Sequence, residues 1–200
     1  MSGNRRWWVI GGVVAVVAVA LAAAFASGEP ERVEDPVGTV SVTGTPLARL
    51  GDPASDPAVG QAAPQAVGAD FDGSEVRIEP TGEPTVVVFV AHWCPSCQAE
   101  VPRIVALAAA GGTEGVRLVA VATANDPLRP NYPASEWLDR EGWPAPVLVD
   151  DKTSSLATAF GLSAYPFFAV LDGEGNVMFR VTGELDPDSL ALLFSIARDA

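Results

Sequence analysis

The two cysteines of the chain, Cys94 and Cys97, are the residues whose type and spacing most directly indicate chemistry. They follow the continuous apolar run Thr85 to Ala91, which predicts a strand buried on both faces, and a helix is predicted to begin at Cys94. At the N-terminus of a helix, unpaired N–H groups and the positive end of the helix dipole stabilise a thiolate. We therefore expect a reactive dithiol in which Cys94 attacks and Cys97 resolves.

Three other interpretations of the pair stay open at this point: a structural disulfide, a metal site, or two inert buried thiols. A purely structural disulfide that closes so short a loop would constrain the unfolded chain little and so would contribute little stability. A zinc site needs four ligands, whereas His92 is the only histidine. The metal alternative is therefore a copper(I) site made by Cys94, Cys97 and the His92 imidazole. Outside such a site, His92 is expected either to favour the thiolate when protonated or to lie on a surface loop.

The N-terminal 26 residues predict that the rest of the chain is exported. Arg5 and Arg6 precede twenty uncharged residues, Trp7 to Ala26, which at ~1.5 Å per residue can cross a hydrocarbon core of ~30 Å. Basic residues before this segment and acids after it place the N-terminus in the cytoplasm. Residues 1–26 are thus expected to be a transmembrane anchor. The small residues before Ser27 also fit a cleavage site, so a secreted form cut after Ala26 is the alternative.

The remainder of the chain divides into a linker and a domain. Residues 27–59 are rich in Pro, Gly, Thr, Ser and acids without an apolar period, which predicts a flexible linker. Residues 60–200 show the pattern of a hairpin around Asp72-Gly73, then alternating strands and helices, then a closing hairpin and helix. This order predicts a mixed sheet covered on both faces. The formal net charge of −13 leaves no basic face for nucleic acid.

Several short motifs are spread over residues 60–200 at specific spacings. They are Gly60-Gln-Ala-Ala-Pro64 with Asp72-Gly73, Trp93-Cys94-Pro95-Ser96-Cys97, Glu100-Val101-Pro102, Tyr165-Pro166 before a strand, and Gly183 before the last helix. Together they resemble a thioredoxin-fold domain, and more narrowly the membrane-anchored TlpA/ResA-type thiol–disulfide oxidoreductases of bacteria. The resemblance implies a thioredoxin-like α/β fold with a mixed central sheet flanked by helices on both faces. It also implies an N-terminal β-hairpin extension.

The same resemblance assigns roles to the residues around the cysteines. Cys94 and Cys97 would form the redox-active disulfide, and Glu100 would tune the thiol pKa or relay protons. Trp93 and Pro95 would border the place where a substrate binds.

On the facing loop, Pro166 would be cis and would leave the Tyr165 backbone free to pair with an extended substrate. Two departures limit the likeness. Val88 stands where thioredoxin has a buried Asp, so Glu100 would have to serve as proton acceptor. Tyr165 is bulkier than the residue usual before the cis-proline.

The implied partners are proteins with thiols or disulfides and a membrane electron donor or acceptor, without a cofactor or a metal. The Glu100 pattern favours a reductant over an oxidant, and one task of such proteins is to keep apocytochrome c cysteines reduced. Two alternatives keep the fold but change the function. One is a copper(I)-delivery module that uses the cysteines and His92, and the other is a thiol peroxidase-like protein, which the spacing of the two cysteines disfavours.

Overall fold

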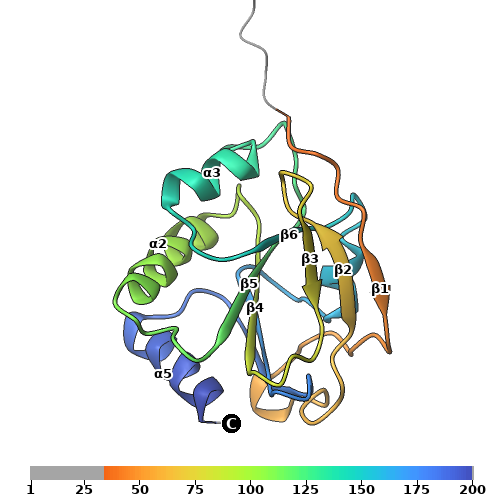
Figure 1. Ribbon diagram of the computed structural model, residues 1–200, viewed down its shortest axis with the longest axis vertical. Helices are drawn as coiled ribbons and strands as arrows, with labels where there is room; N and C mark the ends of the chain where they lie inside the picture. The colour runs from red at the N-terminus through yellow and green to blue at the C-terminus, as the bar shows by residue number, and fades with distance from the viewer. Residues whose placement is uncertain (1–33, 200) are drawn as a thin grey trace, which may run out of the picture. The chain divides into compact units, whose positions relative to one another are not determined.

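In the computed structural model, residues 34 to 199 are described, and they form a three-stranded and a five-stranded sheet with helices packed against them (Figure 1). The smaller sheet contains β1 (Ser41–Thr43), β2 (Gln65–Ala69) and β3 (Glu75–Ile78). The larger sheet contains β4 (Thr85–Val90), β5 (Arg117–Ala122), β6 (Val147–Val149), β7 (Phe167–Leu171) and β8 (Val177–Thr182). The helices are α2 (Pro95–Ala109), α3 (Ala134–Glu141), α4 (Ser155–Ala159) and α5 (Pro187–Arg198), with a short 3-10 helix η1 (Pro53–Ser55).

The five-stranded sheet has the order β6-β5-β4-β7-β8. Strands β4, β5 and β6 run parallel, whereas β7 is antiparallel to β4 and β8 is antiparallel to β7. Every residue of β4 is buried, as its continuous β-branched run predicts for a strand covered on both faces. The carboxyl ends of β4, β5 and β6 meet at one edge, where the chain continues into the two cysteines.

Alternate residues of β4 enter two separate hydrophobic clusters. Val86 and Val88 pack in the cluster that contains residues of α2, α3 and α5. Val87 and Phe89 pack in the opposite cluster, which contains residues of β2, β3 and α4. In Figure 1, α2, α3 and α5 lie on one side of the sheet, and the smaller sheet lies on the other. The predicted mixed sheet with helices on both faces is confirmed.

Strands β2 and β3 pair antiparallel around a tight turn, Asp70 to Ser74. Gly73 adopts a φ of 87° in this turn, and the Asp72 carboxylate accepts a hydrogen bond from the Ser74 N–H. Both features are typical of Asp-Gly turns, because glycine tolerates positive φ and aspartate bonds the backbone two residues on. Gly68 of β2 approaches the Leu148 side chain, so the small sheet packs against β6.

The predicted flexible linker, residues 27–59, carries ordered structure from residue 34 onward. Strand β1 pairs with β2, and Leu47 and Leu50 are buried. Their N–H groups donate to the carbonyls of Ala159 and Gly161 at the end of α4. Residues 34–59 contact the rest of the domain through a few separate buried residues and not through a periodic apolar face. Most of the segment is therefore polar or small, and its composition resembles that of a linker. Residues 34–59, which were expected to be linker, therefore belong to one compact unit with the rest of the described chain.

A buried ion pair ties this N-terminal stretch to the larger sheet. The side chains of Asp56 and Arg180 are both fully buried and form a bidentate pair, one bond of which measures 2.8 Å from Nε to Oδ2. The Arg180 guanidinium also donates to the carbonyls of Ala48 and Phe160. The pair lowers the pKa of Asp56, first through its hydrogen bond to Arg180. A charge buried in this way is tolerated only when its partners are in place.

The predicted membrane span, Trp7 to Ala26, lies outside the described residues. Among the helices of residues 34–199, none has both the length and the apolar character needed to cross a bilayer.

Candidate active site

Cys94 and Cys97 lie where β4 passes into α2. The Cys94 N–H donates to the Ala91 carbonyl at 2.9 Å, and Cys94 occupies the N-cap position with an extended backbone. Pro95 is the first residue of the helix, where its missing N–H leaves no donor unpaired. Both cysteines are free thiols. The local geometry thus places one sulfur directly at the positive end of the helix dipole and the other one turn into the helix.

The two sulfurs have different environments. Cys94 is half-buried, whereas Cys97 has no exposed surface. Burial raises the pKa of the Cys97 thiol, although its sulfur accepts a hydrogen bond from the Ala91 N–H at 3.5 Å. Cys94 is therefore the accessible sulfur of the pair, and Cys97 is enclosed as a thiol.

The loop before β7 faces the first cysteine. The Tyr165–Pro166 peptide bond is cis, and the Cys94 sulfur lies 3.9 Å from the Tyr165 carbonyl oxygen. The Tyr165 ring meets the Trp93 ring edge to face at 5.9 Å between centroids. Segments 71 residues apart in the chain therefore converge on one sulfur. A second cis bond, Tyr132–Pro133, has no counterpart in the sequence-based expectations.

Trp93 is fixed beside the cysteines by the loop that follows β5. Its indole N–H donates to the Ala124 carbonyl at 2.9 Å, and the Arg129 guanidinium lies 4.6 Å above its ring. Ala124 has a φ of 53°, an uncommon conformation for a residue other than glycine. The indole is therefore held by contacts with the loop after β5 and with Tyr165.

Glu100 lies one helical turn after Cys97 and is fully buried. Its Oε2 atom accepts a hydrogen bond from the Leu185 N–H at 3.0 Å and lies 3.4 Å from NH1 of Arg103. Its other oxygen, Oε1, is buried without a hydrogen-bond partner. Burial raises the pKa of Glu100 above its ordinary value, although the bond from Leu185 and the Arg103 charge oppose this effect. The structure thus places a titratable carboxyl group in the interior close to the resolving cysteine.

His92 is not on the surface, which contradicts one of the two expectations for it, and its burial disfavours the protonated form that the other expectation required. It is 1% exposed, and burial lowers its pKa. Its Nδ1 lies 2.7 Å from the Pro130 carbonyl, and its Nε2 accepts a hydrogen bond from the Asp126 N–H at 3.1 Å. The imidazole is therefore neutral, with its proton on Nδ1.

The same geometry bears on the copper alternative. Both ring nitrogens of His92 are engaged by the backbone, so neither is free to bind a metal beside the cysteines. Among residues 34–199, no three His, Cys, Asp or Glu side chains gather closely enough to hold a metal ion.

Sequence reasoning missed Arg103 and Glu184, which surround Glu100. Arg103 follows Glu100 by three residues, a spacing that brings side chains together on a helix, and this signal was available. Glu184 comes from the segment between β8 and α5, and its Oε1 lies 2.7 Å from Arg103 NH1. Only the tertiary fold brings this residue to the site.

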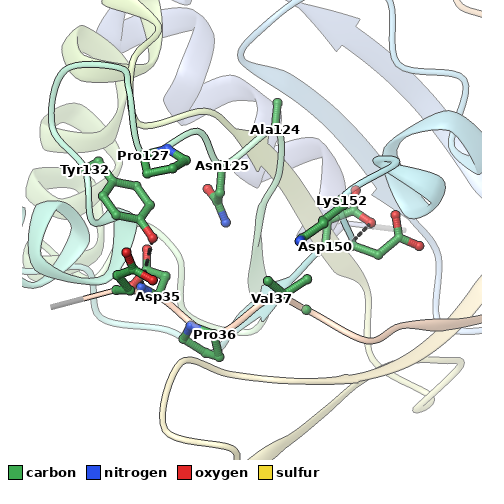
Figure 2. Close-up of a pocket in the computed structure, with 12 residues that line it drawn as sticks. Asp35, Pro36, Val37, Ala124, Asn125, Pro127, Tyr132, Asp150 and Lys152 are labelled. Carbon is green, nitrogen blue, oxygen red and sulfur yellow. Dashed lines mark hydrogen bonds between the residues drawn. The ribbon is translucent and has the colours of Figure 1, made fainter. Parts of the chain in front are cut away.

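A cavity of about 270 Å³ adjoins the loop that carries Ala124. Figure 2 shows Asn125 between Tyr132 on one side and Lys152 on the other. Two acids that line the cavity already accept hydrogen bonds from backbone N–H groups. Asp35 accepts them at the start of α3, and Asp150 accepts them at the start of α4. The Asn125 side-chain oxygen is buried without a partner.

Residues 58–192, more than half of the chain, match the family model described as Redoxin. The chain belongs to the Redoxin family. The predicted resemblance to ResA-type proteins is also confirmed by sequence relatives of this Redoxin. The thiol-disulfide oxidoreductase ResA of Halalkalibacterium halodurans is 25% identical over 184 residues, which cover 92% of this chain and 90% of that protein.

A second group of relatives covers a smaller share. The thiol:disulfide interchange protein DsbE of Haemophilus influenzae is 30% identical over 105 residues, 52% of this chain. The Redoxin chain thus spans about half the length of that relative, 54%.

Solved structures agree with the thioredoxin-like fold predicted from the sequence. MTB dsbF, solved in mixed oxidized and reduced forms, has a TM-score of 0.56 at 28% identity, over 66% of this chain and 93% of that one. StoA from Bacillus subtilis has a TM-score of 0.56 at 20% identity, over 68% of this chain and 98% of that one, and supports the fold alone.

Proposed function

We propose that this Redoxin is a thiol–disulfide oxidoreductase that exchanges the Cys94–Cys97 pair with thiols or disulfides of protein substrates. One observation carries the proposal. A half-buried sulfur at the start of α2 faces the Tyr165 carbonyl beside cis-Pro166, with a second, buried thiol one turn behind it. The names of the relatives, thiol-disulfide oxidoreductase and thiol:disulfide interchange protein, support the same reaction.

In the reducing direction, the Cys94 thiolate attacks one sulfur of a substrate disulfide. That disulfide bond breaks, the other substrate sulfur leaves as a thiolate and takes up a proton, and a mixed disulfide forms on Cys94. Cys97 then loses its proton and attacks the Cys94 sulfur. The Cys94–Cys97 disulfide forms, the substrate's second thiol is released, and two electrons have passed to the substrate. The reverse sequence oxidises a substrate dithiol.

The surrounding residues have roles in holding the substrate. We assign the Tyr165 backbone beside Pro166 to pairing with an extended substrate chain, because its carbonyl lies next to the attacking sulfur. Trp93 and Pro95 flank the same sulfur from the α2 side and would contact that chain. Glu100 is assigned to the proton of Cys97, since it is a buried carboxyl group one turn away.

A trapping experiment tests the exchange. The reduced Cys97→Ser variant, incubated with insulin, should accumulate a covalent complex that dithiothreitol releases. The Cys94→Ser variant should trap nothing, because its remaining sulfur is buried. Wild-type protein should reduce insulin continuously when dithiothreitol is supplied. A folded Cys97→Ser variant that traps no insulin, together with a wild-type protein that reduces none, would refute the proposal.

The direction of electron flow is a separate part of the proposal, and we infer a reductant. Reduction potentials of related dithiols span about −270 mV for reductants to about −120 mV for oxidants. Equilibration of the cysteine pair with defined redox buffers measures this value. A potential near the upper end of the span would reverse the inferred direction.

We propose that the protein acts outside the cytoplasm, anchored through residues 7–26, and receives electrons from or passes them to a membrane protein. The uncharged segment preceded by two arginines supports this location. Membrane fractions of expressing cells washed with alkaline carbonate should retain the full-length chain. Release of a chain that begins at Ser27 would instead indicate the secreted form.

A further inference from the structure

The carboxylate of Glu100 is buried with few hydrogen-bond partners. Its two contacts both fall on Oε2, one from the Leu185 N–H at 3.0 Å and a longer one from Arg103 at 3.4 Å, and Oε1 has no partner. The buried Asp150 offers a contrast within the same chain, because its two oxygens accept hydrogen bonds from four donors. These are Thr123 Oγ1 and the N–H groups of Asp151, Leu156 and Ala157. Burial raises the pKa of both carboxyl groups, but only Glu100 has an oxygen without a hydrogen-bond partner, so a single neighbouring charge has more influence on its state.

The neighbouring positive charge is the guanidinium of Arg103, and one of its nitrogens is shared by three acceptors. Atom NH1 of Arg103 lies 2.7 Å from Glu184 Oε1, 2.9 Å from the Leu185 carbonyl and 3.4 Å from Glu100 Oε2. A guanidinium NH1 carries two hydrogens, so these three acceptors compete for them. Glu184 and the Leu185 carbonyl hold the two shorter contacts, and Glu100 receives the weakest one. Loss of Glu184 would free a hydrogen for Glu100, while the Leu185 carbonyl would still hold Arg103 in place.

The other charged or titratable groups near Glu100 are few. From α2 these are Arg103 and the thiol of Cys97, whose own deprotonation the charge of Glu100 opposes. The segment between β8 and α5 contributes one charged group, Glu184. Strand β4 contributes the apolar Val88 to the cluster that contains Cys97. Arg103 and Glu184 are therefore the charged side chains through which the state of Glu100 can be set. Both are partly exposed, at 34% and 40% of their side-chain surface.

We propose that Arg103 and Glu184 are a pair of positioning residues that set the charge of Glu100, and so control how readily Cys97 gives up its proton in the resolving step. Arg103 favours the ionised carboxylate, which can accept that proton. Glu184 draws Arg103 away and adds a negative charge of its own, and both effects favour the neutral carboxyl. The inference deepens the proposed function and rests on it, because resolution by Cys97 is a step of that exchange.

The decisive measurement is the titration of Glu100 itself in full-length oxidised protein, where Cys97 has no proton to couple with it. Carbon-13 labelling of the glutamate carboxyl groups allows the Glu100 resonance to be followed with pH and assigned through its loss in Glu100→Gln. Arg103→Met should raise the midpoint by about one pH unit or more, the range for removal of an opposite charge within a few ångströms. Glu184→Gln should lower it by roughly half a unit or more. Arg103→Lys, which keeps the charge, should restore most of the wild-type midpoint.

The same variants give a functional readout in the reduced protein. The rate at which a preformed mixed disulfide on Cys94 is resolved should have a pH profile displaced upward in Arg103→Met and downward in Glu184→Gln. A merely structural role would lower the rate at every pH without moving the midpoints in opposite directions. Glu100 midpoints that stay unchanged, or that move the same way in both variants, would overturn the inference. The carboxyl titration needs no turnover, so its outcome is independent of whether the protein exchanges disulfides.

Discussion

At the scale of single residues, two cysteines of the same chemical type have been given opposite properties by their position on one helix. Cys94 lies at the N-cap, half-buried and facing the Tyr165 carbonyl, whereas Cys97 is enclosed. Their spacing and their place after a buried strand were predictable from the sequence. The complete burial of Cys97 was not, because the side chains that cover it come from other parts of the chain.

This asymmetry predicts selective alkylation. In fully reduced protein at pH 7.5, iodoacetamide should modify Cys94 at least about 100-fold faster than Cys97, because the buried thiol with a raised pKa is scarcely ionised. Mass spectrometry of peptides after timed quenching measures both rates. The Cys94→Ser variant is the control, and its remaining thiol should react only after denaturant is added. Similar rates at the two positions in folded protein would contradict the assignment of attacking and resolving sulfurs.

At the scale of elements, the loop from Ala124 to Pro133 is held in place by one buried imidazole. His92 bonds the loop backbone at Asp126 and Pro130, 34 and 38 residues further along the chain. From the sequence, a lone histidine beside the cysteines gives no sign of these partners, so its anchoring role could not be predicted. The loop matters to the site because Ala124 and Arg129 hold Trp93.

The anchoring role predicts a specific pH dependence. Since burial lowers the pKa of His92, the unfolded chain binds a proton near pH 6.5 that the folded chain does not yet bind. Stability from His92 is therefore fully present above about pH 6.5 and is lost as pH falls through the lower folded-state pKa. Urea unfolding at pH 7.5 and 5.5 should show a loss in wild type that is smaller in His92→Asn, by up to about 1.4 kcal/mol, because pH 5.5 lies one unit below the unfolded-state pKa. An equal loss in both proteins would show that His92 does not carry this dependence.

Helix α3 depends on a carboxylate that comes from almost one hundred residues earlier in the chain. Asp35 accepts hydrogen bonds from the Ala134 N–H at 2.6 Å and the Ser135 N–H at 3.3 Å, which are otherwise unpaired at the helix start. Asp35→Ala should lower the free energy of unfolding by about 0.5–2 kcal/mol, the usual effect of removing a side chain that caps the N–H groups at a helix start. The exposed neighbour offers a matched control, and Glu34→Ala should leave the urea midpoint nearly unchanged. Equal midpoints for the two variants would mean that the cap contributes no stability.

At the scale of the whole molecule, the sequence predicted the larger sheet but did not reveal that residues 34–59 pack with it, and both outcomes have one physical reason. Strands such as β4 and amphipathic helices such as α5 carry a period that repeats over several residues, and this pattern survives without knowledge of the fold. Residues 34–59 reach the core instead through separate anchors, chiefly Leu47, Leu50 and Asp56. Separate buried residues do not repeat at a regular spacing in the sequence. Their role can therefore be recognised only from the folded structure, which shows their distant partners.

The packing of residues 34–59 against the rest of the domain predicts that two fragments of the chain differ sharply in stability. A fragment of residues 60–200 lacks Leu47, Leu50 and β1, and it leaves the buried Arg180 guanidinium without Asp56. Removing one partner of a buried ion pair costs about 3–5 kcal/mol, which is a large part of a typical domain's stability of about 5–15 kcal/mol. Residues 34–200 should therefore unfold cooperatively in urea, whereas residues 60–200 should be largely unfolded or melt at a far lower urea concentration.

Variants of the longer fragment separate the ion pair from the other lost contacts. Asp56→Ala alone should destabilise residues 34–200 by about 3–5 kcal/mol, because it strands a buried charge. Asp56→Leu combined with Arg180→Met should recover much of that loss, since apolar side chains can replace a buried pair without the cost of desolvation. If the double variant is no more stable than Asp56→Ala, the bonds from Arg180 to the carbonyls of Ala48 and Phe160 matter more than the buried charge. If residues 60–200 are instead as stable as residues 34–200, the N-terminal stretch is an appendage of the domain and the predicted boundary at Gly60 holds.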